Sequence, residues 1–232
     1  IAVENTSASV VSRFIGATPS SSNIFSLLES LCKQIAGKYG ADTSTPTEYK
    51  ELVEDFHKKL VFATAEKPLI IMLDALDQLS EAENAKSLQW LLIELPEYVK
   101  AIVSVLDPSE CYDQLKRRLP EEQLLQVGLM EQQEGEALLD IWLKEAKRTL
   151  QQTQRQDVLS QFRQCGLPLY LKIAFEEAQL WKSYTLGEIS GTDVRGIILE
   201  FLGNLSEESR HGKEMVKHAL GYLAAGKNGL TE

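Results

Sequence analysis

One short run of apolar residues limits the folds open to this chain more than any other feature. Between Pro68 and Asp74 the sequence reads PLIIMLD, so five successive apolar side chains end at a carboxylate. An unbroken apolar run suits a central strand of a parallel sheet covered on both faces, because a strand with one wet face alternates apolar and polar residues. We therefore expect an α/β fold with this strand near its centre.

Three further segments are predicted to be strands of the same sheet. They are short β-branched or apolar runs at residues 8–17, 99–106 and 124–129. Helical patterns lie between them, at residues 24–35, 46–60, 82–95 and 109–119. Strands that alternate with helices favour a parallel sheet. From residue 131 onward only helical periods are found, which predicts an appended helical subdomain.

Charge and composition exclude several functions. The chain has 24 Lys+Arg against 34 Asp+Glu, a net charge of −10, which argues against nucleic-acid binding by bulk charge. No run of about 18 apolar residues is present, so no membrane span is expected. Three widely spaced cysteines fit neither a zinc site nor a disulfide framework and indicate a reducing compartment, the cytoplasm. Because the chain begins with Ile1, we expect it to be a segment of a longer protein.

Polar residues at the ends of the predicted strands are the candidate site. In an open parallel sheet, ligands bind beyond the carboxyl ends of the strands. Asp74 ends the apolar strand, Asp77 follows three residues later, and Ser104 ends the next strand. A carboxylate at Asp74 can hold Mg²⁺ beside nucleotide phosphates, and a hydroxyl at Ser104 can sense the γ-phosphate. The alternatives are that the acids only cap a helix and that Ser104 lies in an ordinary turn.

Two glycine-containing motifs have different interpretations. Residues 221–228 nearly match a phosphate-binding loop, but Asn228 replaces the required Ser or Thr and a helical pattern precedes the motif. We therefore interpret it as a helix end. Gly166 and Pro168 lie between two predicted helices, where glycine ends one helix and proline starts the next.

The remaining polar and aromatic residues give no catalytic pattern. His57 and the basic cluster at residues 116–118 lie on polar stretches, which predicts solvated side chains. The three tryptophans fall at apolar helix positions and are expected in the core. No Ser/His/Asp or Cys/His arrangement is indicated.

Taken together, several segments resemble the NACHT-type branch of the STAND NTPases, a family of multidomain signal-transduction ATPases. The resemblance is greatest to NACHT proteins with WD or tetratricopeptide repeats, including telomerase-associated and nephrocystin-like proteins. It covers nearly the whole chain. The segments that carry it are RFIGATPSSSNIFSLLESLCKQIA at 13–36, PLIIMLDALDQL at 68–79, AIVSVL at 101–106, CGLPLYL at 165–171 and ALGYLAAGKNGLTE at 219–232.

The resemblance implies a fold in three parts. Residues 1–130 would be a P-loop NTPase-type parallel sheet without its first strand and Walker A loop. Residues 131–190 would be a helical lid subdomain with a Gly-x-Pro motif. Residues 191–232 would begin a winged helix.

The same resemblance implies roles for individual residues toward ATP or ADP and Mg²⁺. Asp74 would be the Walker B acid that contacts Mg²⁺, with Asp77 near the attacking water. Gln78 stands where many relatives have an acid, which disfavours fast hydrolysis. Ser104 would lie near sensor 1, although the Arg that some relatives carry after this strand is absent. Gly166 and Pro168 would form the motif whose proline packs on the adenine.

The function implied by the resemblance is a nucleotide-dependent switch. Exchange of ADP for ATP would change the conformation of a signalling or scaffold protein and permit oligomerisation, with slow hydrolysis. The expected partners are an upstream effector domain, downstream WD or tetratricopeptide repeats, and other subunits of a large assembly. The alternative is a degenerate NTPase fold that acts as a nucleotide-independent scaffold. Without a Walker A loop, which precedes the first strand in this family, the chain by itself would be inactive.

Overall fold

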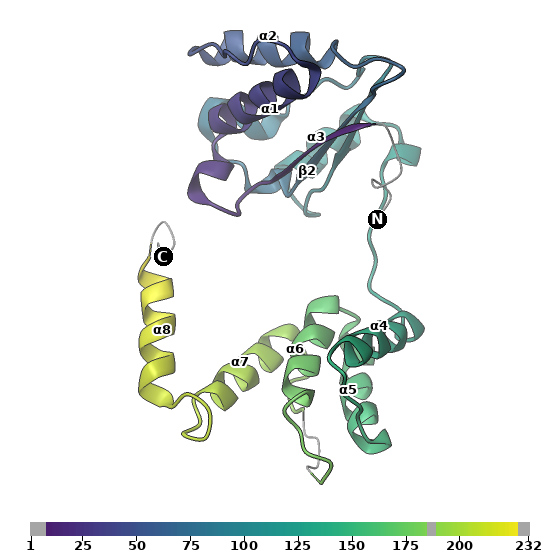
Figure 1. Ribbon diagram of the computed structural model, residues 1–232, viewed down its shortest axis with the longest axis vertical. Helices are drawn as coiled ribbons and strands as arrows, with labels where there is room; N and C mark the ends of the chain where they lie inside the picture. Colours follow the sequence, from purple (N-terminus) through teal and green to yellow (C-terminus); the bar gives the residue numbers. More distant parts are fainter. Residues whose placement is uncertain (1–7, 185–188, 227–232) are drawn as a thin grey trace. The chain divides into compact units, whose positions relative to one another are not determined.

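The computed structural model describes residues 8–184 and 189–226, and the chain divides into two compact units (Figure 1). The first unit extends to Leu125 and contains a parallel sheet with helices. The second begins at Gln126 and is built from helices. The expected α/β fold is therefore confirmed. Residues 227–232, the last part of the expected winged-helix segment, lie outside the described residues.

Three parallel strands form the sheet of the α/β unit. They are β1 (Ser9–Phe14), β2 (Leu69–Asp74) and β3 (Val99–Val103), in the order β1-β2-β3. Phe14 is paired with Asp74, and Leu73 with Val103, so the carboxyl ends of all three strands meet at one edge. The central place of the apolar strand, predicted from its sequence, is confirmed.

Helices α1 (Ile24–Tyr39) and α2 (Tyr49–Leu60) lie together on one side of the strands (Figure 1). The side chain of Asn23 caps α1 by accepting a hydrogen bond from the Ser26 amide at 3.0 Å. Gly40 ends this helix in the left-handed conformation, with φ of 67°, which glycine adopts without a Cβ clash. The leucines and isoleucines spaced along α1 are fully or almost fully buried, as their period predicts. A shorter helix, α3 (Glu110–Arg118), follows β3.

The sheet is covered on one face, whereas the sequence predicted cover on both. Val11, Ile71 and Val99 point into the core and are at most 5% exposed. Met72 and Ile102 alternate with the core-facing positions and are 36% and 59% exposed. Among the described residues of the α/β unit, the helix with the most contacts to the strands, α1, packs on the core side. The continuous apolar run therefore reflects a second face that no described element of the α/β unit covers.

The expected helix over residues 82–95 is wrong. A short 3₁₀ segment (Ala82–Ser87) is interrupted by left-handed Glu83 and Asn84, and irregular turns follow. Tertiary contacts explain the difference. His57 Nε2 lies 2.8 Å from the Trp90 carbonyl oxygen. Arg118 donates to the carbonyls of residues 88 and 91 at 2.7 and 2.9 Å. Carbonyls that a helix would have used are thus bound by side chains, and the prediction that His57 and Arg118 are merely solvated is also wrong.

The expected strand over residues 124–129 is wrong as well. The segment makes no ladder hydrogen bonds, and its alternate apolar residues Leu125, Val127 and Leu129 are 91%, 89% and 66% exposed. A strand needs a neighbour, and the described residues provide none for it.

The second unit is a set of successive helices around its own core. They are α4 (Gln132–Glu145), α5 (Gln152–Cys165), α6 (Pro168–Ala178), α7 (Val194–Leu205) and α8 (Lys213–Ala225). Phe162 and Tyr170 are fully buried at the centre. A Cβ on Gly135 would lie 2.1 Å from the ring of Phe162, so this glycine permits α4 and α5 to approach closely. In the described ranges no helix is both long and apolar enough to cross a membrane.

A buried carboxylate connects α6 to the residues around the α7–α8 turn. Glu177 is 5% exposed, and its carboxylate accepts a hydrogen bond from each of the two terminal nitrogens of Arg210, at 2.8 and 2.9 Å. The amide of Asn204 donates to the same carboxylate at 2.9 Å. Hydrogen bonds of this number and geometry are what a buried ion needs to offset the cost of its desolvation.

We expect Cys165 to be alkylated much faster than the other two cysteines. Burial raises the pKa of the Cys32 thiol to about 12 and that of Cys111 to about 11, so neither forms much thiolate near neutral pH. Cys165 is partly exposed. Iodoacetamide labelling at about pH 8, followed by peptide mass spectrometry, measures the three rates. All three should react in denaturant, and equal rates for the native chain would contradict the burial.

Candidate functional site

The carboxyl edge of the sheet brings together the polar residues predicted from the sequence. Asp74 is the last residue of β2, and Ser104 follows β3 directly. The Ser104 hydroxyl donates to Asp74 Oδ1 at 2.5 Å and accepts from the Ala75 amide at 2.8 Å. A hydrogen bond to a charged oxygen is stronger than one between neutral groups, so this contact fixes the rotamer of the Asp74 carboxylate.

Asp77 lies on the turn that follows Asp74, but its carboxylate is directed to the backbone of the loop after β3. Its Oδ1 accepts a hydrogen bond from the Leu106 amide at 2.9 Å. The turn between Asp74 and Asp77 passes through Ala75, whose φ of 59° is left-handed and costs energy for a residue with a Cβ. Asp77 thus ties the strained turn after β2 to the loop after β3.

Gln78 packs over the end of the first strand. A Cβ added to Gly16 would lie 1.7 Å from Gln78 Oε1, and Gly16 itself has a φ of 82°. Only glycine allows the backbone this conformation and leaves room for the amide. Gln78 therefore covers the turn after β1.

Asp74 is suited to hold a cation. It is exposed, and among the described residues its second oxygen, Oδ2, has no hydrogen-bond partner. One carboxylate alone binds Mg²⁺ weakly, because this ion is normally held by one or two carboxylates together with substrate phosphates and waters. No group of three or more His, Cys, Asp or Glu residues within the described ranges could hold a metal ion. The residues present therefore fit a metal that arrives with a phosphate ligand.

Gly166 and Pro168 have the local structure predicted for them in the helical unit. Gly166 ends α5 with a φ of 61°, and Pro168 is in the first turn of α6. The Gly166 carbonyl accepts from the Met130 amide at 2.8 Å, and a Cβ at Gly166 would lie 3.0 Å from Leu129. Pro168 and the flanking Leu167 and Leu169 are exposed. The motif therefore presents a small apolar surface at the start of α6.

The near-match to a phosphate loop is helical, as its sequence predicts. Gly221 lies within α8, and Gly226 caps the end of this helix. Lys227 and Asn228 lie outside the described residues. A phosphate-binding loop presents its backbone amides ahead of a helix, whereas the amides of α8 are used within it.

Some contributors to the site were not evident from the sequence. The Leu106 amide carries no residue-type signal, because any residue donates through its backbone. Gly16 falls within the predicted strand at residues 8–17, but its need to accommodate Gln78 depends on strand register. The only local signal for the strained turn is Ala75, a small residue between two acids.

Comparison with known proteins gives relatives along nearly the whole chain. The mouse NACHT and WD repeat domain-containing protein 2 is 32% identical over 228 residues, 96% of this chain, and the human protein of that name is 31% identical. The human NACHT domain- and WD repeat-containing protein 1 is 29% identical, and the rat telomerase protein component 1 is 24% identical over 98% of the chain.

The chain spans about an eighth of the first relative, 13% of its length. A scan of protein-family models finds no match, and no solved structure matches. The identity nevertheless extends through both units. Over nearly its full length the chain is thus homologous to a segment of the NACHT and WD repeat domain-containing proteins, which is consistent with the NACHT-type resemblance of its motifs.

Proposed function

We propose that this chain is part of a nucleotide-dependent switch in a larger NACHT-type protein. In this role the Asp74 carboxylate holds Mg²⁺ on bound ATP or ADP, and Ser104 keeps that carboxylate oriented. The observation that carries the proposal is the contact between Ser104 and Asp74, which presents the free oxygen of an exposed carboxylate at the carboxyl edge of a parallel sheet.

The open face of the sheet supports a phosphate-binding segment elsewhere in the parent protein. The exposed side chains on this face include Phe14, Met72 and Ile102, and Phe14 is paired with Asp74 in the register. Apolar strand residues at this exposure indicate a surface that another element covers. A helix that follows the phosphate loop would cover it, and the loop would bring backbone amides next to Asp74.

Each residue has a separate task in this proposal. Bound Mg²⁺ would neutralise phosphate charge and orient the phosphates. Asp74 would hold the ion through Oδ2 while Ser104 occupies Oδ1. Asp77 would keep the loop after β3 in place through the Leu106 amide. A change in this loop would be transmitted to the turn after β2 because the two are hydrogen-bonded.

The variant Asp74→Asn in the full-length protein tests the proposal. We expect Mg-ATP affinity to fall by about tenfold or more, because the amide binds the cation far less well than a carboxylate. Calorimetric titration with and without Mg²⁺ measures the effect. Asp113→Asn is the matched control, since Asp113 is exposed on α3 and lies outside the turn after β2. Equal affinity for Asp74→Asn and the wild type would exclude a metal role for Asp74.

The second candidate function is a nucleotide-independent structural scaffold, a degenerate NTPase fold inside a large assembly. The specific observation in its favour is that the Asp77 carboxylate is directed through Oδ1 to the Leu106 amide, and that Gln78, whose amide cannot act as a base for water, covers Gly16. Nucleotide binding without phosphate release would favour a switch that does not hydrolyse. The absence of binding by the full-length wild type would favour the scaffold.

A further inference from the structure

Two adjoining hollows lie at the turn between α4 and α5, within the helical unit. The larger has a volume of about 640 Å³ and the smaller of about 330 Å³, and both are open to solvent. They share the turn residues Arg148, Thr149 and Leu150. They lie beside the carboxyl end of α6, whereas Gly166 and Pro168 are at its amino end. The hollows are therefore a feature separate from the Gly-x-Pro motif.

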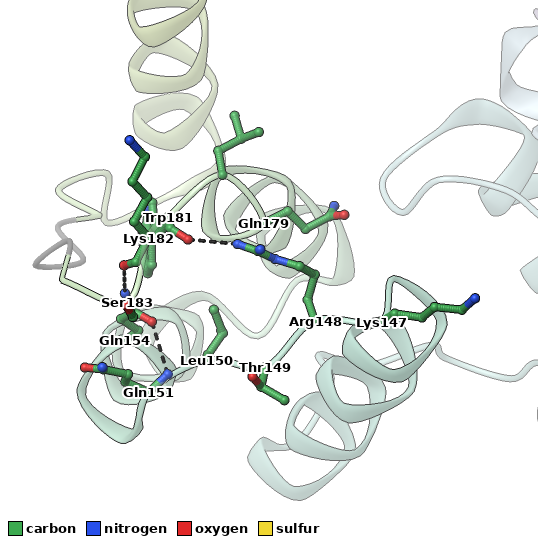
Figure 2. Close-up of a pocket in the computed structure, with 11 residues that line it drawn as sticks. Lys147, Arg148, Thr149, Leu150, Gln151, Gln154, Gln179, Trp181, Lys182 and Ser183 are labelled. Carbon is green, nitrogen blue, oxygen red and sulfur yellow. Dashed lines mark hydrogen bonds between the residues drawn. The ribbon is translucent and has the colours of Figure 1, made fainter.

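The larger hollow is built from defined contacts (Figure 2). Arg148 reaches across it to donate to the Trp181 carbonyl at 2.8 Å. Gln154, which is 3% exposed, accepts from the Gln151 amide at 3.0 Å and donates to the Lys182 carbonyl at 2.9 Å. These contacts join the start of α5 to the segment after α6, so the shape of the hollow is fixed by hydrogen bonds.

The charge around these hollows is opposite to that of the chain. The chain as a whole carries −10. The cationic side chains that line the two hollows include Lys144, Lys147, Arg148 and Arg155. Among the described lining residues the only carboxylate is Asp140, and Arg155 already forms an ion pair with it. The surplus of positive charge attracts an anionic ligand.

Lys147 adds a second observation. Its φ of 52° is left-handed, at the position after α4 where glycine is the usual residue. The left-handed conformation is unfavourable for a residue with a Cβ, so a lysine at this position suggests a function for its side chain. Figure 2 shows Lys147 at the rim, with its chain extended away from the hollow, where an incoming ligand would meet it first.

The lining also has an apolar part. Leu180 is 60% exposed, and Leu150 and Trp181 are partly buried beside it. A site that encloses a small molecule covers most of that molecule's surface, which an open hollow does not do. An open, elongated surface with cations at its rim and an apolar strip suits an extended peptide that carries both acidic and apolar side chains.

We propose that the α4–α5 turn and the carboxyl end of α6 form a docking surface for an acidic, leucine-containing peptide segment of a partner protein. Lys144, Lys147 and Arg148 would contact its carboxylates. A leucine of the peptide would lie against Leu150 and Leu180. Peptide binding at this surface does not require nucleotide binding, so the outcome of the peptide test is independent of the role of Asp74.

Fluorescence anisotropy with a labelled peptide of about eight residues, in which leucines are interspersed among glutamates, tests this surface on the 232-residue chain. We expect saturable binding that weakens severalfold between about 50 and 300 mM salt. The double variant Lys144→Glu/Lys147→Glu should weaken binding by about tenfold or more. A peptide with glutamine in place of glutamate should not bind.

The matched control is Lys213→Glu/Lys217→Glu, which changes the net charge equally on exposed positions of α8. Its affinity should stay within about twofold of the wild type. Equal loss in both double variants would show attraction by bulk charge and overturn the site. Equal competition by a thymidine oligonucleotide would overturn the peptide assignment, and dimerisation of the chain that blocks the peptide would assign the surface to a second copy.

A photo-crosslinking peptide provides a measurement that needs no variant of the chain. With a benzophenone side chain in place of one leucine, we expect adducts at residues 147–151 or 179–183. Mass spectrometry of the digested adduct locates them. Adducts confined to other segments would overturn the proposal even if the peptide binds.

Discussion

Replacement of Arg210 with alanine is expected to destabilise the helical unit by about 3–5 kcal/mol, because it leaves a buried carboxylate without its cation. The side chain of Glu177 is 7% exposed, and Arg210 supplies two of the hydrogen bonds that satisfy it. The Asn204 amide would remain, but an amide does not compensate a full charge. Urea denaturation monitored by circular dichroism measures the free energy of unfolding.

Two variants distinguish the effect of breaking the Glu177–Arg210 ion pair from the effect of removing any arginine. Arg195→Ala removes an exposed arginine from α7 and should change the unfolding free energy by no more than about 0.5 kcal/mol. The double variant Glu177→Met/Arg210→Met removes both charges and should recover most of the stability, since apolar pairs of similar volume replace buried ion pairs at little cost. A loss of less than about 1 kcal/mol for Arg210→Ala would contradict a structural role for the pair.

The variant Trp90→Ala should destabilise the α/β unit by about 3–5 kcal/mol, through lost burial and the cavity that remains. Trp90 is 2% exposed and packs beside Phe56, with ring centroids 6.3 Å apart. Its Nε1 donates to the Ala85 carbonyl at 3.0 Å. Denaturant titration of the chain reports this change on the transition of the α/β unit.

Trp90→Phe is the companion variant. It keeps an aromatic ring in the core but leaves the Ala85 carbonyl without its donor, so we expect an intermediate loss of about 1–3 kcal/mol. Trp181→Ala, in the helical unit, is the control for the loss of a tryptophan elsewhere. A Trp90→Ala variant as stable as the wild type would mean that residues 82–95 do not pack as the structure shows.

The two regions where the sequence predicted regular structure wrongly have one cause. Residues 82–95 carry leucines at helical spacing, but their carbonyls are bound by Arg118 and His57. Residues 124–129 have strand-like alternation but no neighbouring strand among the described residues. Local periodicity reports which face is apolar, whereas partners distant in the sequence decide whether the backbone forms a helix or a strand.

The location of the candidate site could be predicted from the sequence, whereas most of its hydrogen bonds could not. An acid at the end of an apolar strand and a serine at the end of the next were enough to place Asp74 and Ser104 at one edge, because parallel strands end together. The sequence could not indicate that Ser104 donates to Asp74 while Asp77 accepts from the Leu106 amide. Those contacts depend on strand register and on the left-handed turn at Ala75.

The sequence by itself determined the α/β class, the central apolar strand, most of the helices and the resemblance to NACHT-type proteins. These follow from side-chain periodicity and short motifs, which are local properties of the chain. Only the tertiary structure decided that no described element of the α/β unit covers one face of the sheet, that Glu177 is paired with Arg210, and that cations gather around the α4–α5 turn of an acidic chain. The physical reason is that burial, charge pairing and surface charge depend on residues far apart in the sequence, which only folding brings together.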